Sequence, residues 1–107
     1  MNHTDPCIPN LENQRLIQIL IDKLIFLKSS NNYTDEVDLL TEACIQTDIK
    51  MVAIYREDIS NVFMCSCQIV LNQNMCIISG FGVSERESLK NAVGKFLQYL
   101  FNQVRFN

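Results

Sequence analysis

Hydrophobic residues recur every three or four positions in the last quarter of the chain, and this spacing predicts a long amphipathic helix. Ser84 and Glu87 at its start have the spacing of a capping box, in which the two side chains bond free backbone N–H groups of the first turn. Gly94 interrupts the repeat and indicates close packing against another backbone, because glycine costs a helix up to about 1 kcal/mol relative to alanine. The apolar face, about five turns long, consists of Leu89, Ala92, Val93, Phe96, Leu97 and Leu100.

A second helical pattern occupies residues 10–28 and has more apolar positions than a surface helix, which needs a stripe of only about 100°. The polar residues 1–9, which include both prolines, are expected to form a flexible leader before it. Because apolar side chains cover most of its circumference, we expect this helix to bury one side against its own domain and another against a second chain. The residues expected at that partner interface are Ile17, Leu20 and Leu24.

Residues 35–101 predict a further helix, three strands and the C-terminal helix, followed by a tail at 102–107. The further helix covers residues 37–47. The order α-β-β-β-α favours an α+β fold in which two helices cover one face of a three-stranded antiparallel sheet, preceded by the additional helix at 10–28. Three segments with strand patterns, joined by short polar turns, predict the sheet: 51–57, 62–71 and 75–79.

The alternation of side chains along a strand assigns these segments two faces. If Phe63 points toward the helices, Cys65 and Cys67 do so too. A solvent-exposed sheet face is normally polar, whereas the opposite face here is apolar and marks a candidate interaction site. Either the helix at 10–28 covers this face as part of the core, or a partner protein or a second copy of the chain binds there. The apolar residues assigned to the face are Val52, Ile54, Met64, Val70, Met75 and Ile77.

Charge and composition narrow the functions that we expect. The net charge of −3 and the pI near 5 argue against a strong nucleic-acid binder, because phosphate binding requires basic residues. The five cysteines lack Cys-x-x-Cys spacing and histidine partners, so we expect free thiols in an intracellular protein of the nucleus or cytoplasm, and no metal site. No signal peptide or membrane-spanning run is apparent. No catalytic constellation or phosphate loop stands out, so we expect no enzymatic activity, cofactor or small-molecule substrate.

The stretch at residues 80–100 resembles the last strand and second helix of the double-stranded RNA-binding domain family. Upstream, the Leu39-Leu40-x-Glu42 sequence resembles the leucine-leucine-x-glutamate helix of that family, and Tyr55 and Phe63 fall where its first two strands carry aromatic residues. The resemblance covers about residues 35–101 and implies the same α-β-β-β-α fold. The residues that fit the family's glycine–serine pattern are Gly80, Gly82, Ser84, Arg86, Ser88 and Ala92.

The same resemblance implies where duplex RNA would bind. The family contacts two minor grooves and the phosphates between them, and the matching positions here are Glu42, the turn at 58–61, and Arg86 with Lys90. The turn lacks the glycine, proline and histidine of the family, and Glu85 stands where a lysine is usual. Acidic residues at the start of a helix occupy the positive potential that would attract a phosphate. We therefore expect duplex-RNA binding to be weak, if it is present at all.

Our leading hypothesis from the sequence is a degenerate member of this family that acts as a protein-interaction or dimerisation module. The resemblance further implies an RNA-processing or RNA-silencing assembly. A weak double-stranded RNA-binding protein is the alternative, and an accessory domain of a larger enzyme is the third possibility.

Overall fold

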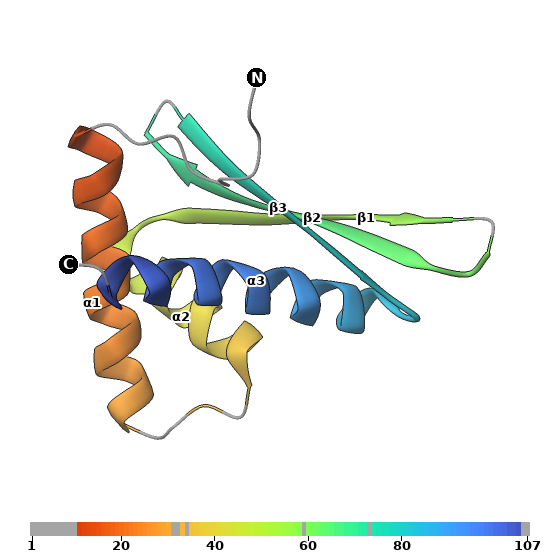
Figure 1. Ribbon diagram of the computed structural model, residues 1–107, viewed down its shortest axis with the longest axis horizontal. Coiled ribbons are helices and arrows are strands. Elements are labelled where there is room, and N and C mark those ends of the chain that lie inside the picture. The colour runs from red at the N-terminus through yellow and green to blue at the C-terminus, as the bar shows by residue number, and fades with distance from the viewer. Residues whose placement is uncertain (1–10, 31–32, 34, 59, 73, 106–107) are drawn as a thin grey trace.

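The computed structural model describes residues 11–30, 33, 35–58, 60–72 and 74–105 (Figure 1). Within these residues the fold is α+β, with an antiparallel sheet in the strand order β1-β2-β3. This confirms the predicted α-β-β-β-α order with an additional N-terminal helix, and it is compatible with the fold of the double-stranded RNA-binding domain. The elements are α1 (Leu11–Ser30), α2 (Glu36–Thr47), β1 (Lys50–Glu57), β2 (Phe63–Leu71), β3 (Asn74–Gly82) and α3 (Glu85–Arg105).

Three boundaries differ from the sequence-based expectation by two residues or more, and one of them is the end of β3, at Gly82 instead of residue 79. α1 continues two residues beyond the predicted end at residue 28, and α3 continues to Arg105, through most of the expected tail. The expected leader at 1–9 lies outside the described residues. The end of a helix is hard to place from periodicity alone, because the last turn receives few apolar contacts.

Helices α2 and α3 form one layer and the sheet forms the other. α3 packs along β3 and β2, and α2 lies beside it (Figure 1). The predicted alternation is confirmed on β2, where Cys65, Cys67 and Ile69 are fully buried, and on β3, where Cys76 and Ile78 are buried. These inward residues therefore meet the apolar sides of the two helices and form the core.

α1 lies across α2 and α3 at one end of the molecule (Figure 1). Leu20 and Leu24 are fully buried there, and full burial of a leucine side chain stabilises the fold by about 1.5–3 kcal/mol. The alternative in which this helix covers the outer side of the sheet is therefore wrong, because its apolar side packs on the other two helices. The expectation that Leu20 and Leu24 bind a partner is wrong for the same reason, since neither exposes any surface.

The closest approach between a helix and the sheet occurs at Gly80 and not at Gly94. A Cβ atom on Gly80 would lie 2.3 Å from the backbone nitrogen of Ala92 and 2.3 Å from the carbonyl oxygen of Ser88. A Cβ atom on Gly94 would meet only the carboxylate of Glu36, at 3.4 Å. The interpretation of Gly94 as the site of close packing is therefore wrong, and the backbone of α3 rests on the glycine of β3 instead.

Candidate protein-interaction surface

The outer face of the sheet is the side turned away from α2 and α3. We define it by the residues that alternate with the buried positions, because residues paired across neighbouring strands lie on the same side of a sheet. From one end of the sheet to the other, its four rows are Lys50–Val70–Met75, Val52–Gln68–Ile77, Ile54–Ser66–Ser79 and Arg56–Met64–Phe81.

Large apolar side chains on this face are open to solvent. The exposed fraction is 50% for Ile54, 52% for Ile77, 42% for Met75 and 53% for Phe81. Val52 and Met64 are half-buried beside them. The structure thus brings all six apolar residues predicted for the outer face, including the half-buried Val70, onto one surface, which matches an interaction site better than isolated surface residues would.

Phe81 is the residue of this face that the sequence analysis missed. It stands between two glycines, beyond the predicted end of the third strand at residue 79, whereas β3 extends to Gly82. The signal that could have found it is the alternation itself, because Met75, Ile77 and Phe81 are separated by even numbers of residues. Its ring continues the apolar surface toward the turn between β1 and β2.

The twelve strand positions of the outer face include two cations and no acid, and Asp58 in the adjoining turn is the one acid that we place beside them, although the whole chain has a net charge of −3. Lys50 and Arg56 stand near the two ends of β1, and both are exposed. The guanidinium of Arg56 makes no hydrogen bond or ion pair with any described residue. This side of the molecule is therefore positive relative to the rest.

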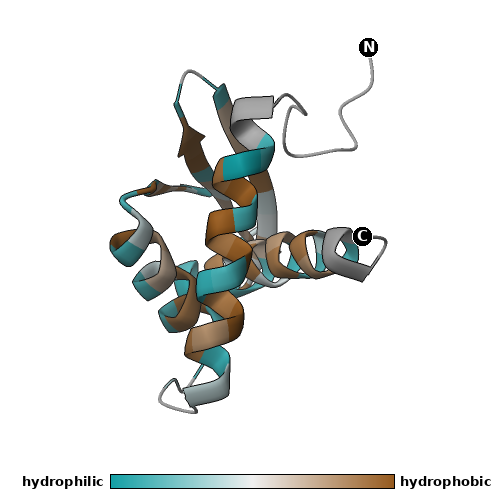
Figure 2. Ribbon diagram, turned by 90° about the vertical axis from the view of Figure 1, so that its left-hand side faces the viewer, coloured by the Kyte–Doolittle hydropathy of each residue, from teal (hydrophilic) through white to brown (hydrophobic). Residues whose placement is uncertain are grey.

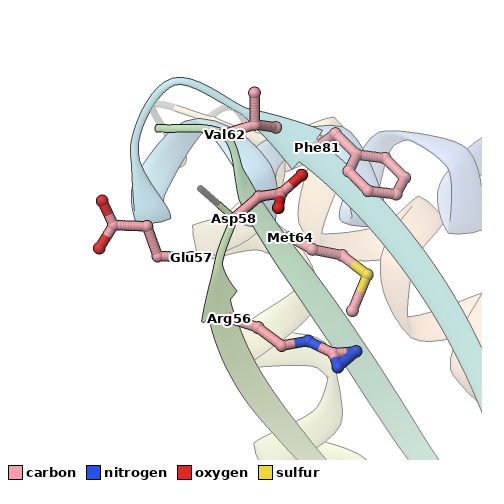
Figure 3. Close-up of a pocket in the computed structure, with 6 residues that line it drawn as sticks. All are labelled: Arg56, Glu57, Asp58, Val62, Met64 and Phe81. Atoms are coloured by element: carbon pink, nitrogen blue, oxygen red, sulfur yellow. The ribbon is translucent and has the colours of Figure 1, made fainter. Parts of the chain in front are cut away.

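A hollow of about 370 Å³ lies at the Arg56 end of the outer face (Figure 3). Arg56, Met64 and Phe81 come from one row across the three strands and point to the same side, while Glu57 points away from them. Asp58 and Val62, from the turn between β1 and β2, complete the lining. The hollow therefore combines three apolar side chains with the guanidinium of Arg56 on one side and the carboxylate of Asp58 at the turn.

The free edge of β3 is partly occupied by side chains of α3. Asn91 Nδ2 donates to the carbonyl oxygen of Phe81, and Lys95 Nζ donates to the carbonyl oxygen of Ser79 at 2.8 Å. Unpaired backbone groups on an edge strand are the usual template for adding a strand from another chain. Since these two carbonyl oxygens are already bonded, this half of β3 offers its face to a partner more readily than its edge.

The residues predicted as possible RNA contacts make other interactions or stand alone on the surface. Arg86 forms an ion pair with Asp35, 51 residues earlier in the chain. Glu42 accepts a hydrogen bond from Gln46 Nε2 at 2.7 Å, on the same helix. Lys90 is exposed on α3. The guanidinium expected to meet a phosphate is therefore held by a carboxylate of the same protein.

Asp35 has a structural role at the start of α2. Its side chain accepts a hydrogen bond from the backbone N–H of Asp38 at 2.9 Å, as an N-cap residue does. That hydrogen bond, followed by the hydrogen bond and charge of Arg86, lowers the pKa of the Asp35 carboxyl. The ion pair thus joins the first turn of α2 to the first turn of α3.

The start of α3 is satisfied by its own side chains. The backbone N–H of Glu87 donates to Ser84 Oγ at 3.1 Å, and the backbone N–H of Val83 donates to Glu87 Oε1 at 2.6 Å. The predicted capping box is confirmed for Ser84, although the carboxylate of Glu87 bonds the residue before the cap. An acid therefore occupies the position where a phosphate would be expected to bind.

A layer of thiols lies in the core beneath the sheet. Cys44, Cys65 and Cys67 are free and buried. Burial, and to a smaller extent Cys67, raises the pKa of the Cys44 thiol to about 12; burial, with Cys65, raises the pKa of Cys67 to about 11. These thiols are therefore protonated at neutral pH and behave as small apolar side chains. Cys76 is disulfide-bonded, so the expectation of free thiols is wrong for that residue.

α1 provides a second exposed apolar surface, as expected for a helix that is hydrophobic on two sides. Figure 2 shows hydrophobic and hydrophilic residues alternating along the side of α1 that faces the viewer. The exposed fraction is 42% for Ile19, 47% for Ile25 and 64% for Phe26, whereas Ile17 is half-buried against the core. This surface is separate from the outer face of the sheet.

Protein-family models and curated proteins were both compared with this chain, and none of them matches it. None of the helices in the described part of the chain has the length and hydrophobicity needed to cross a membrane. Nor do three or more His, Cys, Asp or Glu side chains of the described residues group where they could hold a metal ion.

Proposed function

We propose that this protein is a protein-interaction module of the double-stranded RNA-binding domain type, and that it binds a segment of another protein on the outer face of its sheet. The observation that carries the proposal is the cluster of Ile54, Ile77, Met75 and Phe81, each at least 42% exposed on one face that no described helix covers. Exposed apolar groups of this kind gain free energy when a partner removes them from water. A place in an RNA-processing or RNA-silencing assembly is the part of the proposal that rests on the family resemblance alone.

Charge supports a protein partner over duplex RNA. Arg86 is paired with Asp35, and the Glu87 carboxylate occupies the start of α3. Duplex binding depends on cations that are free to neutralise phosphates. A weak duplex-RNA binder remains the alternative that the experiment below tests.

Charge also supports a different protein over a second copy of the chain. Two outer faces meeting in a symmetric dimer would bring Lys50 and Arg56 of both copies into one interface, with Asp58 at the turn as the one acid that each face supplies among its described residues. Pairing along β3 would have to displace the bonds from Asn91 and Lys95. Homodimerisation is therefore a separate outcome of the test.

The test compares Ile77→Asp on the outer face with Phe26→Asp on α1, the same kind of change at an apolar residue elsewhere that is even more exposed. A photo-crosslinking amino acid in place of Ile77 identifies the bound chain, and calorimetry with that purified chain then measures affinity. We expect Ile77→Asp to weaken binding at least about tenfold, which corresponds to about 1.4 kcal/mol, and Phe26→Asp to leave it unchanged.

Two controls separate the alternatives. A 20-base-pair RNA titrated at low and moderate salt should bind weakly; tight, salt-dependent binding abolished by Arg86→Glu and Lys90→Glu would overturn the proposal in favour of RNA. Light scattering should report a monomer. A dimer that dissociates on Ile77→Asp would replace the partner protein with a second copy of the chain.

A further inference from the structure

We infer that the segment bound on the outer face is an amphipathic helix with acidic residues, one of whose carboxylates pairs with Arg56 while an apolar side chain enters the hollow beside Met64 and Phe81. This inference rests on the proposed function of the outer face and specifies the chemistry of the partner. It is carried by the charge of the face, the shape of its Arg56 end and the occupied edge of β3.

The charge of the face selects an acidic partner. Of the twelve outer-face positions, two are cations, none is an acid, and the others are apolar or neutral. Arg56 has no partner among the described residues. A free guanidinium beside apolar side chains favours a carboxylate, which it can bind through two parallel hydrogen bonds.

The spacing of the two cations sets the length of the segment. Lys50 and Arg56 are six residues apart on β1, so they are separated by about 20 Å along the strand. A helix rises 1.5 Å per residue and needs about 13 residues to span that distance. The exposed side chains of Ile54 and Ile77 lie in the rows between the two cations. The matching helix therefore has an acid near each end and an apolar stripe between them.

The hollow provides a site for one apolar side chain. Its volume of about 370 Å³ is at the small end of the range for binding pockets. Met64 and Phe81 supply an adaptable thioether and an aromatic ring, both of which suit contact with a Leu or Phe side chain. Asp58 lies at the turn end of the hollow, so a carboxylate of the partner is favoured on the β1 side, by Arg56, and disfavoured at the turn (Figure 3).

A helix fits this surface better than an added strand. The carbonyl oxygens of Ser79 and Phe81 on β3 are already bonded by α3. A helix pairs its backbone groups internally except at its two ends and packs on a sheet through side chains, which makes a second layer on the uncovered side.

The test uses the full chain and two synthetic helical peptides that share a leucine stripe. One peptide carries glutamates 14 residues apart, a spacing of about 21 Å that puts both on the same side of the helix, and the other carries lysines at the same positions. Binding is followed by the NMR shifts of the Ile and Met methyl groups. We expect the Glu peptide to shift the signals of Ile54, Met64 and Ile77 and to bind at least about tenfold more tightly than the Lys peptide at low salt.

Charge reversal gives the decisive control. Arg56→Glu should abolish the preference for the Glu peptide and restore binding of the Lys peptide, whereas Lys90→Glu, the same change on α3, should alter neither. Equal binding of the two peptides, binding of neither, or shifts confined to Ile19 and Ile25 on α1 would overturn the inference. Tighter binding of a single-stranded RNA oligonucleotide than of the Glu peptide would also overturn it. In each case crosslinking from position 77, followed by calorimetry with Ile77→Asp, still decides separately whether the outer face binds a protein.

Discussion

Replacing Gly94 and Gly80 by alanine should change stability in opposite directions. Gly94 lies in the middle of α3, and a methyl group there would meet only the Glu36 carboxylate, 3.4 Å away at the end of an exposed side chain. Alanine is favoured over glycine in a helix by about 1 kcal/mol, partly because it restricts the unfolded chain. We expect Gly94→Ala to raise the free energy of unfolding by about 0.5–1 kcal/mol and Tm by roughly 3–6 °C.

Gly80→Ala adds the same methyl group where no space exists. The new carbon would lie 2.3 Å from two backbone atoms and 2.8 Å from Ala92 Cα, whereas carbon atoms in contact sit about 3.5–4.0 Å apart. α3 would have to move away from β3 by about 1 Å, which loosens the contacts of the fully buried Val93 and Phe96. Overpacking of this kind costs about 1–3 kcal/mol, and we expect the upper end because both nearest atoms are backbone.

Urea denaturation followed by circular dichroism measures both changes, provided that the slope of free energy against urea concentration stays constant. The pair controls for the added methyl group, which is identical in the two variants. A Gly94→Ala variant less stable than the wild type by more than about 1 kcal/mol, or a neutral Gly80→Ala variant, would refute the placement of α3 on the sheet described above.

Three further predictions concern the core thiols and the helix caps. Burial raises the thiol pKa from 9.0 to about 12 for Cys44 and to about 11 for Cys67, so the unfolded chain loses these protons at lower pH than the folded chain does. The free energy of unfolding should therefore fall as pH rises above 9, by up to about 1.4 kcal/mol per pH unit per thiol. Urea midpoints that do not change between pH 8 and pH 10 would contradict this. The lowered pKa of Asp35 means that its stabilising contribution is present at neutral pH and is lost as pH falls through its folded pKa, so Asp35→Asn should be less stable than the wild type at pH 7 and should approach it in strong acid. Parallel acid titrations of the two proteins measure that difference, and a gap that widens in acid would exclude the role given to the carboxylate. Ser84→Ala should lower the free energy of unfolding by about 1 kcal/mol through loss of the N-cap hydrogen bond, measured by urea denaturation against Ser60→Ala in a turn.

The helices and strands of this fold could be predicted from the sequence because apolar residues repeat every three or four positions in a helix and every second position in a strand. The two-residue alternation through Cys65 and Cys67 assigned the inner side of β2 correctly, and the helical repeat through Val93 and Phe96 assigned the buried side of α3. The outer-face residues followed from the same alternation. Periodicity decides such cases because each element has one clearly apolar side.

Features that depend on which elements meet could not be predicted in this way. Both sides of α1 are apolar, so its period did not reveal that Leu20 and Leu24 would face α2 and α3 while Phe26 remained exposed. The pairing of Arg86 with Asp35 joins residues 51 positions apart, and no local pattern indicates it. Close packing was predicted at Gly94 and not at Gly80, because the clash that requires glycine at position 80 involves a backbone from another element.

The bonds from Asn91 and Lys95 to β3 have a consequence for how this protein behaves at high concentration. An edge strand with unpaired backbone groups, next to an exposed apolar face, can pair with the sheets of further copies of the chain and so extend into fibrils. Asn91 and Lys95 of α3 bond carbonyl oxygens on part of the β3 edge and leave the apolar face uncovered. We therefore expect these two bonds to oppose fibril growth along this part of β3, although the apolar face beside it stays exposed to solvent.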